Sequence, residues 1–305
     1  MRHLWFFVRL AVAVILLVIV VTRVDPGEAA AQVRSAPWWV FVVPPALLVL
    51  NSGIHAIRIG VLLPAPRPGF LAVLASVLIG NFFGIFLPSG GGEAAKVVAL
   101  GRATGDFETA LAALATSRLL ELIPWGLLCV WGAVVVLPDR LPGYVWLAWL
   151  TAAGFSAVLL AVCGFGPRLG ALPLPAGLRA RVARLLAFRP PRRHVYASLA
   201  ASVPFAAINC LVIWLVQRAY GAPLSYPEIM GVAPTLDVVI SLPVSVSGVG
   251  VREAVYVDGF GAYGVAAPVA LAIAFTRWTG ELLRAGVGGL VFLAGASSGG
   301  SRGDT

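Results

Sequence analysis

The sequence predicts an all-α integral membrane protein with about six full spans plus two re-entrant helical hairpins in an inverted-topology repeat. Only 11% of its 305 residues are charged, 60% are hydrophobic, and the mean hydropathy is +0.94. Apolar runs of about 20 residues recur, and a helix of that length crosses the roughly 30 Å of bilayer hydrocarbon. Two further apolar stretches carry glycine- and proline-rich breaks in their middle. These breaks predict the hairpins.

Charge and cysteine content exclude several classes of function. The net charge of +9 would suit a nucleic-acid-binding protein, but the basic residues flank apolar runs, where the positive-inside rule accounts for them. No nucleic-acid partner is therefore expected. The three cysteines, Cys129, Cys163 and Cys210, lie inside apolar runs without metal-ligand spacing. We interpret them as packing residues and expect no metal and no cofactor.

The first half, residues 1–137, is predicted to be span, span, hairpin, span. Its beginning resembles a signal peptide, because an apolar run is followed by the small residues Ala29, Ala30 and Ala31. We interpret it as a retained first span. The four elements are expected at 4–22, 38–58, 70–103 and 107–137.

The second half, residues 138–296, is predicted to repeat this order with the opposite sense across the membrane. Its elements are a span, a basic loop, a span, a hairpin and a final span, with the first four at 144–163, 164–194, 195–219 and 228–264. A short tail, 297–305, is expected to be disordered.

The basic loop fixes the orientation. It holds seven arginines and no Asp or Glu, which places it in the cytoplasm. Counting from it places both termini in the cytoplasm, and Arg58 and Arg67 then fall on the same side. The two hairpins enter from opposite sides, the first from the cytoplasm and the second from outside.

Matching motifs at the two breaks predict the repeat. The first reads Leu87-Pro88-Ser89-Gly90-Gly91-Gly92-Glu93-Ala94, and the second reads Leu242-Pro243 and then Ser247-Gly248-Val249-Gly250-Val251-Arg252-Glu253-Ala254. An offset of about 160 residues separates the two glutamates, and nearly the same offset relates other rare membrane polar residues. These pairs are Arg118 with Arg277, Glu121 with Glu281, Arg58 with Arg218, and Asn51 with Asn209.

The small residues at the breaks are candidates for substrate binding. Glycines let the backbone turn sharply and expose N–H groups, and the helix N-termini that follow add positive dipole ends, so an anionic headgroup could be cradled there. The alternative is that they only allow close helix packing. The candidates are Ser89, Gly90, Gly91, Gly92, Ser247, Gly248 and Gly250.

Two glutamates open the helices after the breaks. Glu93 and Glu253 have the position of residues that cap a helix and complement its dipole. The alternative is that they receive protons, or pair with Lys96 and Arg252, and so gate the site. Lys96 is the only lysine of the chain and lies one turn after the first glycines.

Other ionisable residues inside apolar runs are functional candidates because burying charge in a membrane is costly. Arg118 and Glu121 share one helical face, and Arg277, Glu281 and Arg284 share another. In each Arg–Glu pair the two charges could neutralise each other, and the pair could hold the helices of the bundle together. Arg284 favours the alternative that its cluster contacts a phosphate group.

Polar residues before the breaks complete the candidate site. Asn81 and Asp237 could bind substrate or hydrogen-bond backbone groups that the breaks leave unpaired. Asn51, His55 and Arg58 fall on one helical face, and His55 is interpreted as a hydrogen-bonded packing residue.

The segments Asn81–Lys96 and Ser245–Ala254 resemble the flippase-like membrane domain of the lysylphosphatidylglycerol synthase family, which also occurs beside archaeal dolichol-linked glycosyltransferases. The run from Gly248 to Ala254 is similar to the family's glycine pair followed by Val-Arg-Glu-Ala. In the first motif Gly91 and Lys96 replace the basic residue between the glycines and the arginine after the glutamate. The resemblance extends from about residue 5 to 295.

The resemblance implies lipid handling in a bacterial or archaeal cell membrane. The leading hypothesis is a lipid translocase, not driven by ATP, that moves a phospholipid or polyprenyl phosphate between leaflets, with the headgroup entering between the hairpins. The first alternative is a non-catalytic partner that presents lipid to a separate synthase or glycosyltransferase. A lipid-modifying membrane enzyme is the second, but no catalytic motif or soluble catalytic domain is recognised, so enzymatic activity is not expected.

Overall fold

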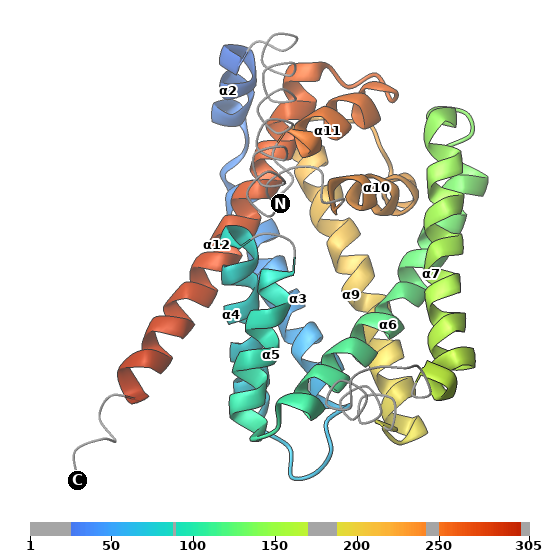
Figure 1. Cartoon of the computed structure of the whole chain (residues 1–305). Coiled ribbons are helices and arrows are strands. Elements are labelled where there is room, and N and C mark those ends of the chain that lie inside the picture. The colour runs from blue at the N-terminus through green and yellow to red at the C-terminus, as the bar shows by residue number, and fades with distance from the viewer. Residues whose placement is uncertain (1–25, 88–89, 170–187, 242–249, 300–305) are drawn as a thin grey trace, which may run out of the picture. The chain divides into compact units, whose positions relative to one another are not determined.

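The computed structural model describes residues 26–87, 90–169, 188–241 and 250–299, and all regular structure in these ranges is helical. The α-helices are α2 (Pro26–Ser35), α3 (Val43–Gly60), α4 (Phe70–Phe86), α5 (Gly91–Thr104), α6 (Phe107–Trp131), α7 (Pro142–Leu169), α9 (Arg192–Ala219), α10 (Tyr226–Ser241), α11 (Val251–Gly261) and α12 (Ala267–Gly299) (Figure 1). A 3-10 helix, η1 (Trp38–Phe41), precedes α3, and a π-helical turn, η2 (Gly132–Val136), continues α6.

The chain is an integral membrane protein. Four helices of the described ranges are long and apolar enough to cross a membrane: Trp38–Gly60, Phe107–Val136, Pro142–Ala161 and Arg192–Ala219. The predicted first span, 4–22, lies outside the described residues. The last helix, α12, is 33 residues long but carries Arg277, Glu281 and Arg284 near its middle, and it is not among the four. The prediction of about six spans therefore stays a prediction.

Element boundaries differ from the predicted ones at three places. Helix α2 forms where the sequence predicted no span or hairpin. Helix α7 continues to Leu169, so the first part of the predicted loop 164–194 is helical, while residues 170–187 lie outside the description. Helix α12 ends at Gly299, and residues 300–305 of the predicted tail lie outside the described residues, so the disordered tail stays a prediction.

The chain divides into two compact units, which are described separately. Unit 1 comprises Met1–Leu48, Leu127–Ala152 and Ala207–Leu283, and unit 2 comprises Val49–Gly126, Ala153–Ala206 and Arg284–Thr305. The boundaries fall inside α3, α6, α7, α9 and α12. This division follows spatial contacts, whereas the repeat of 1–137 and 138–296 was inferred from sequence order and stays a prediction.

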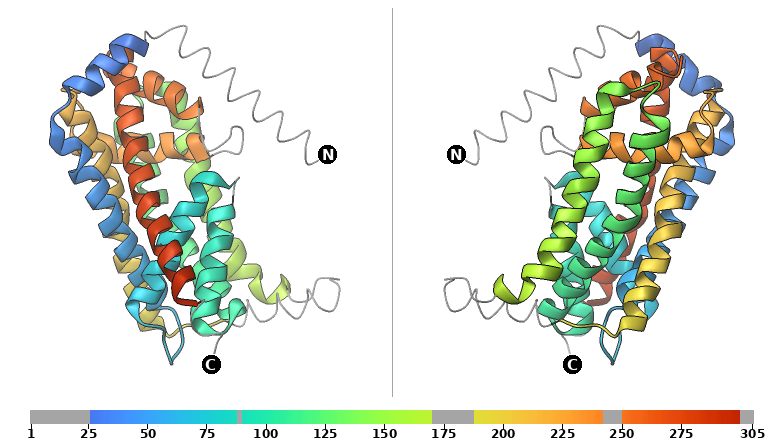
Figure 2. Two further views of the ribbon diagram at one scale, coloured as in Figure 1. Left: turned by 90° about the vertical axis from the view of Figure 1, so that its left-hand side faces the viewer. Right: turned by 90° about the vertical axis from the view of Figure 1, so that its right-hand side faces the viewer.

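Each unit contains one pair of helices separated by a predicted break. In unit 2, α4 and α5 lie side by side (Figure 1; Figure 2), and in unit 1 the pair is α10 and α11, which contact each other. The α4–α5 pair packs closely because Gly92 faces α4: a Cβ there would lie 2.6 Å from the carbonyl oxygen of Gly80. Gly132 and Gly231 bring η2 and α10 into similar backbone contact.

Short capping motifs set the start of the helices beside these pairs. Gly105 ends α5 with φ of +74°, and Asp106 then accepts hydrogen bonds from the N–H groups of Glu108 at 2.9 Å and Thr109 at 3.2 Å. Helix α10 begins with a comparable cap, in which the N–H of Ser225 donates to Glu228 at 2.7 Å. The turn between α5 and α6 is therefore short, and it places α6 next to the hairpin.

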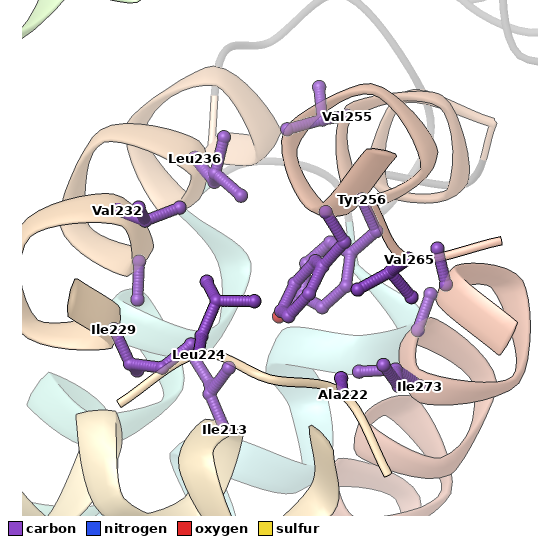
Figure 3. Close-up of a cluster of buried hydrophobic side chains, with 14 of the residues drawn as sticks. Ile213, Ala222, Leu224, Ile229, Val232, Leu236, Val255, Tyr256, Val265 and Ile273 are labelled. Carbon is purple, nitrogen blue, oxygen red and sulfur yellow. The ribbon is translucent and has the colours of Figure 1, made fainter. Parts of the chain in front are cut away.

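Each unit has an apolar core of its own. In unit 1 the core gathers side chains of α9, α10, α11 and α12, and Figure 3 shows the ring of Tyr256 pointing into it near Leu224 and Val265. In unit 2 the core joins α3, α4, α5 and α6 through residues such as Ile59 and Leu100. Both cores lie directly beside the charged clusters described next.

Candidate functional site

Five charged side chains from three helices of unit 2 form one continuous series of ion pairs. In order they are Arg58, Glu121, Arg118, Glu93 and Lys96. Arg58 Nη1 lies 3.1 Å from Glu121 Oε2, and Arg118 Nη1 lies 3.0 Å from Glu121 Oε1. Lys96 Nζ lies 2.9 Å from Glu93 Oε1, which Arg118 Nη2 also contacts. We call this series the ion chain.

The ion chain is buried at its ends and accessible in its middle. The side chain of Arg58 is fully buried, and those of Lys96 and Glu121 are 5% and 10% exposed. Glu93 and Arg118 are 42% and 46% exposed. A ligand can therefore reach the Glu93–Arg118 pair, while the rest holds that pair in place.

Arg58 anchors the buried end. Its Nε donates to Ser202 Oγ at 2.8 Å, its Nη2 donates to the carbonyl oxygen of Ser117 at 2.8 Å, and its guanidinium lies 4.7 Å from the centroid of the Phe205 ring. The sequence predicted Arg58 among the cytoplasmic arginines and not in the site. Its position on one face with Asn51 and His55, both of them buried as well, was the signal for a site in the protein interior.

Two predicted pairings, one in the first hairpin and one in α6, are present in the ion chain. Glu93 pairs with Lys96 rather than only capping α5, and Arg118 pairs with Glu121 across one helical turn. The stem of Lys96 runs across Gly80 of α4, where a Cβ would overlap Lys96 Cγ. A residue without a side chain at position 80 therefore leaves room for the lysine.

The backbone before α5 has the predicted sharp turn. Gly90 has φ of +93°, a conformation that favours glycine, and Gly91 and Gly92 form the first turn of the helix. Ser89 lies outside the described residues. Asn81 Nδ2 donates to Ser52 Oγ at 3.2 Å, which joins α4 to α3.

The second hairpin of the prediction, in unit 1, starts its second helix in the same way. Gly250 has φ of +81°, and Glu253 is again the third residue of the helix. Here Glu253 is buried and its Oε2 accepts a hydrogen bond from the Gly250 N–H at 2.7 Å. This is the bond that a helix-capping glutamate makes. Arg252 is half-buried. Ser247 and Gly248 lie outside the described residues.

Unit 1 also holds a charged cluster, built differently. Arg277 Nη1 donates to Asp237 Oδ1 at 2.8 Å and to the Tyr256 hydroxyl at 2.6 Å, and Nη2 donates to Asp237 Oδ2 at 3.3 Å. Asp237 thus pairs with an arginine. The backbone of the break that follows it, 242–249, lies outside the described residues. Tyr256 was not predicted. An aromatic residue in the middle of α11 carried no charge signal that could have identified it.

The predicted face of Arg277, Glu281 and Arg284 is divided between the units. Arg277 and Glu281 belong to unit 1, and Arg284 belongs to unit 2. Glu281 and Arg284 are half-buried. The hydrogen bonds of Arg277 go to α10 and α11, so this arginine fastens the hairpin helices of unit 1 to α12.

The chemistry of the candidate site is that of anion recognition. Among the described residues no group of three or more His, Cys, Asp or Glu side chains could hold a metal ion. The ion chain presents a guanidinium and an ammonium, from different helices, to the same carboxylate oxygen. Those donors match a phosphate or carboxylate oxygen.

Comparison with known proteins agrees with this membrane architecture. The family model described as the lysylphosphatidylglycerol synthase TM region matches residues 6–277. No curated protein and no solved structure gave a match.

Proposed function

The chain belongs to the family of the lysylphosphatidylglycerol synthase TM region, and from this premise we propose that it is a lipid translocase, not driven by ATP. It moves a lipid with an anionic or polar headgroup, such as a phospholipid or a polyprenyl phosphate, between the two leaflets.

The ion chain carries this proposal. It contains three cations, Arg58, Arg118 and Lys96, and two carboxylates, Glu93 and Glu121. Ionised groups inside membrane helices are costly, and a purely structural cluster is expected to be balanced and sealed. This one has an excess positive charge and an accessible centre. Both features favour a site that takes an anion.

The phosphate of a headgroup would bind at the accessible centre. Arg118 can offer a planar pair of N–H donors, and Lys96 can add an ammonium from α5. The acyl or prenyl tails stay in the hydrocarbon throughout, so only the headgroup needs a polar path. Binding the phosphate offsets part of the several kcal/mol that its transfer into an apolar medium costs.

Leaflet exchange in proteoliposomes tests this function. Headgroup-labelled phosphatidylglycerol and a polyprenyl phosphate are reconstituted with wild type, with Arg118→Gln, and with the matched control Arg102→Gln on the exposed side of α5. We expect exchange by wild type and the control, and a loss of about tenfold or more in Arg118→Gln, because a charge-assisted contact is removed. Exchange no faster than in empty vesicles would overturn the proposal.

The orientation belongs to the same proposal. We place both termini in the cytoplasm of a bacterial or archaeal cell, since the basic segment 164–194 favours that side. Reporter domains fused separately to each end give the test, and a terminus that reports from outside the cell contradicts the orientation.

A second candidate is a membrane partner that presents lipid to a separate synthase or glycosyltransferase. It is favoured by α7, whose span is 17% buried compared with 39% for the other three, and which exposes Trp146, Trp149 and Leu160. Stable co-purification with such an enzyme, together with no exchange by the chain alone, would favour this role. We propose no reaction for the chain itself, and recovery of a chemically altered lipid would contradict that.

A further inference from the structure

The helices α5 and α11 begin alike but use the same glutamate position in two ways. Each follows a glycine with positive φ, Gly90 at +93° and Gly250 at +81°, and each has glutamate as its third residue. In α11, Glu253 turns back onto the glycine N–H at 2.7 Å. In α5, Glu93 extends forward to Lys96 and Arg118.

The forward position of Glu93 coincides with the place of an anionic ligand oxygen. Its Oε1 accepts from both Lys96 Nζ and Arg118 Nη2, which come from different helices. A headgroup phosphate needs the same two donors. The carboxylate and the phosphate therefore compete for them.

Glu253 shows where the carboxylate of Glu93 can go. Gly90 and Gly250 both have positive φ and close the same first turn, because the N–H of Ala94 bonds the Gly90 oxygen at 3.0 Å and the N–H of Ala254 bonds the Gly250 oxygen at 3.0 Å. A rotation about the side-chain bonds of Glu93 can therefore reach the Gly90 N–H. There the carboxylate lies at the positive end of the α5 dipole and can stay ionised.

We propose that Glu93 is an exchangeable counter-ion: a phosphate headgroup takes Lys96 and Arg118, and the Glu93 carboxylate moves onto the Gly90 N–H, the position that Glu253 holds in α11. The inference rests on the proposed function and deepens it. It explains why the middle of the ion chain is accessible while both ends are buried, and it requires no proton uptake. The ligand is a phosphate group, carried by a lipid or free.

The single lysine of the chain permits a direct test. Full-length protein in detergent micelles, labelled with 13C at lysine Cε, gives one signal that reports on Lys96. The probes are short-chain phosphatidylglycerol, inorganic phosphate and, as a lipid without a phosphate group, short-chain diacylglycerol. We expect phosphatidylglycerol to shift the Lys96 signal saturably, because its ammonium exchanges a carboxylate for a phosphate. A shift with inorganic phosphate as well assigns the site to the phosphate group alone.

Variants distinguish counter-ion exchange at Glu93 from electrostatic attraction of the phosphate without displacement of Glu93. In Glu93→Gln the competing charge is gone, so half-saturation should occur at about a tenfold lower concentration of phosphatidylglycerol. Glu93→Ala should also lower the half-saturating concentration, and it serves as a second variant if Glu93→Gln does not fold. In Glu253→Gln the titration should match wild type, since that residue caps α11.

Three outcomes overturn the counter-ion exchange. They are no shift of the Lys96 signal with any probe, an equal response to diacylglycerol and phosphatidylglycerol, and half-saturation in Glu93→Gln that equals wild type. Leaflet exchange measured on the same protein after reconstitution into vesicles distinguishes the two proposals. Leaflet exchange without a Lys96 response overturns the counter-ion proposal and leaves the translocase proposal standing. A Lys96 response without leaflet exchange supports the counter-ion proposal and overturns the translocase proposal.

Discussion

The two hairpins share a backbone motif and differ in what its glutamate does. Both second helices start after a glycine with positive φ and carry glutamate as their third residue. In unit 1 that glutamate is buried and caps its own helix, while Arg277, Asp237 and Tyr256 form a separate cluster. In unit 2 the glutamate stands in the accessible middle of the ion chain. One motif therefore serves a structural cap in one place and a charged contact in the other.

A shared motif at the start of two helices therefore does not assign the same role to its glutamate. What separates Glu93 from Glu253 is the set of neighbours: Lys96 follows Glu93 by one turn, and Arg118 approaches from α6. Matched variants with equal effects in both units would contradict this difference in roles. Variants that change stability without changing the lipid response, or the reverse, would support it.

The largest loss of stability is expected at Arg58. Replacing it in Arg58→Met should lower the free energy of unfolding by about 3–5 kcal/mol, because Glu121 keeps its charge in a buried place with one partner fewer. Denaturant unfolding in mixed micelles measures it. Arg102→Gln, on the exposed side of α5, should change the value by less than about 0.5 kcal/mol. A loss at Arg58 no larger than in this control would show that the ion chain is not anchored there.

Asp237→Asn should have the next largest effect. It weakens a charge-assisted pair with Arg277 that is mostly buried, so a loss of about 1.5–3 kcal/mol is expected in the same unfolding measurement. The response of the Lys96 signal to phosphatidylglycerol should stay as in wild type, because Lys96 belongs to unit 2. A weakened lipid response with unchanged stability would reverse the roles assigned to the two clusters.

Gly80→Ala tests the space reserved for Lys96. A Cβ at this position overlaps the lysine stem and lies 2.8 Å from the Gly92 oxygen, so overpacking should cost about 1–3 kcal/mol and displace the Lys96 signal. Gly154→Ala in α7 is the matched control, because a Cβ there meets nothing within 4 Å. That change should instead stabilise the helix by about 0.5–1 kcal/mol. Equal effects at both glycines would contradict the close approach of α4 and α5.

The smallest effect is expected at Glu253. Glu253→Ala removes the hydrogen bond to the Gly250 N–H and should cost about 0.5–2 kcal/mol, the range for a lost helix cap. Glu253→Gln keeps an acceptor oxygen and should cost less. If both variants lose the same stability, the charge of Glu253 rather than its hydrogen bond stabilises α11.

Sequence patterns predicted the helical breaks, the pairs Glu93–Lys96 and Arg118–Glu121, and the family, because these depend on neighbours within a few residues of each other. They did not predict that Arg58 joins Glu121 or that Asp237 joins Arg277. Those contacts depend on how separate helices pack, and residue spacing along one helix carries no information about the partner helix. Tyr256 was missed for the same reason.

The central claim is that Glu93 acts on the lipid while Glu253 supports the fold. Leaflet exchange of labelled phosphatidylglycerol in proteoliposomes containing wild type, Glu93→Gln or Glu253→Gln, with equal amounts of folded protein, tests it most directly. We predict that the rate or its dependence on lipid concentration changes by about tenfold in Glu93→Gln and stays near wild type in Glu253→Gln. Equal changes in both variants, or none in either, would contradict the claim.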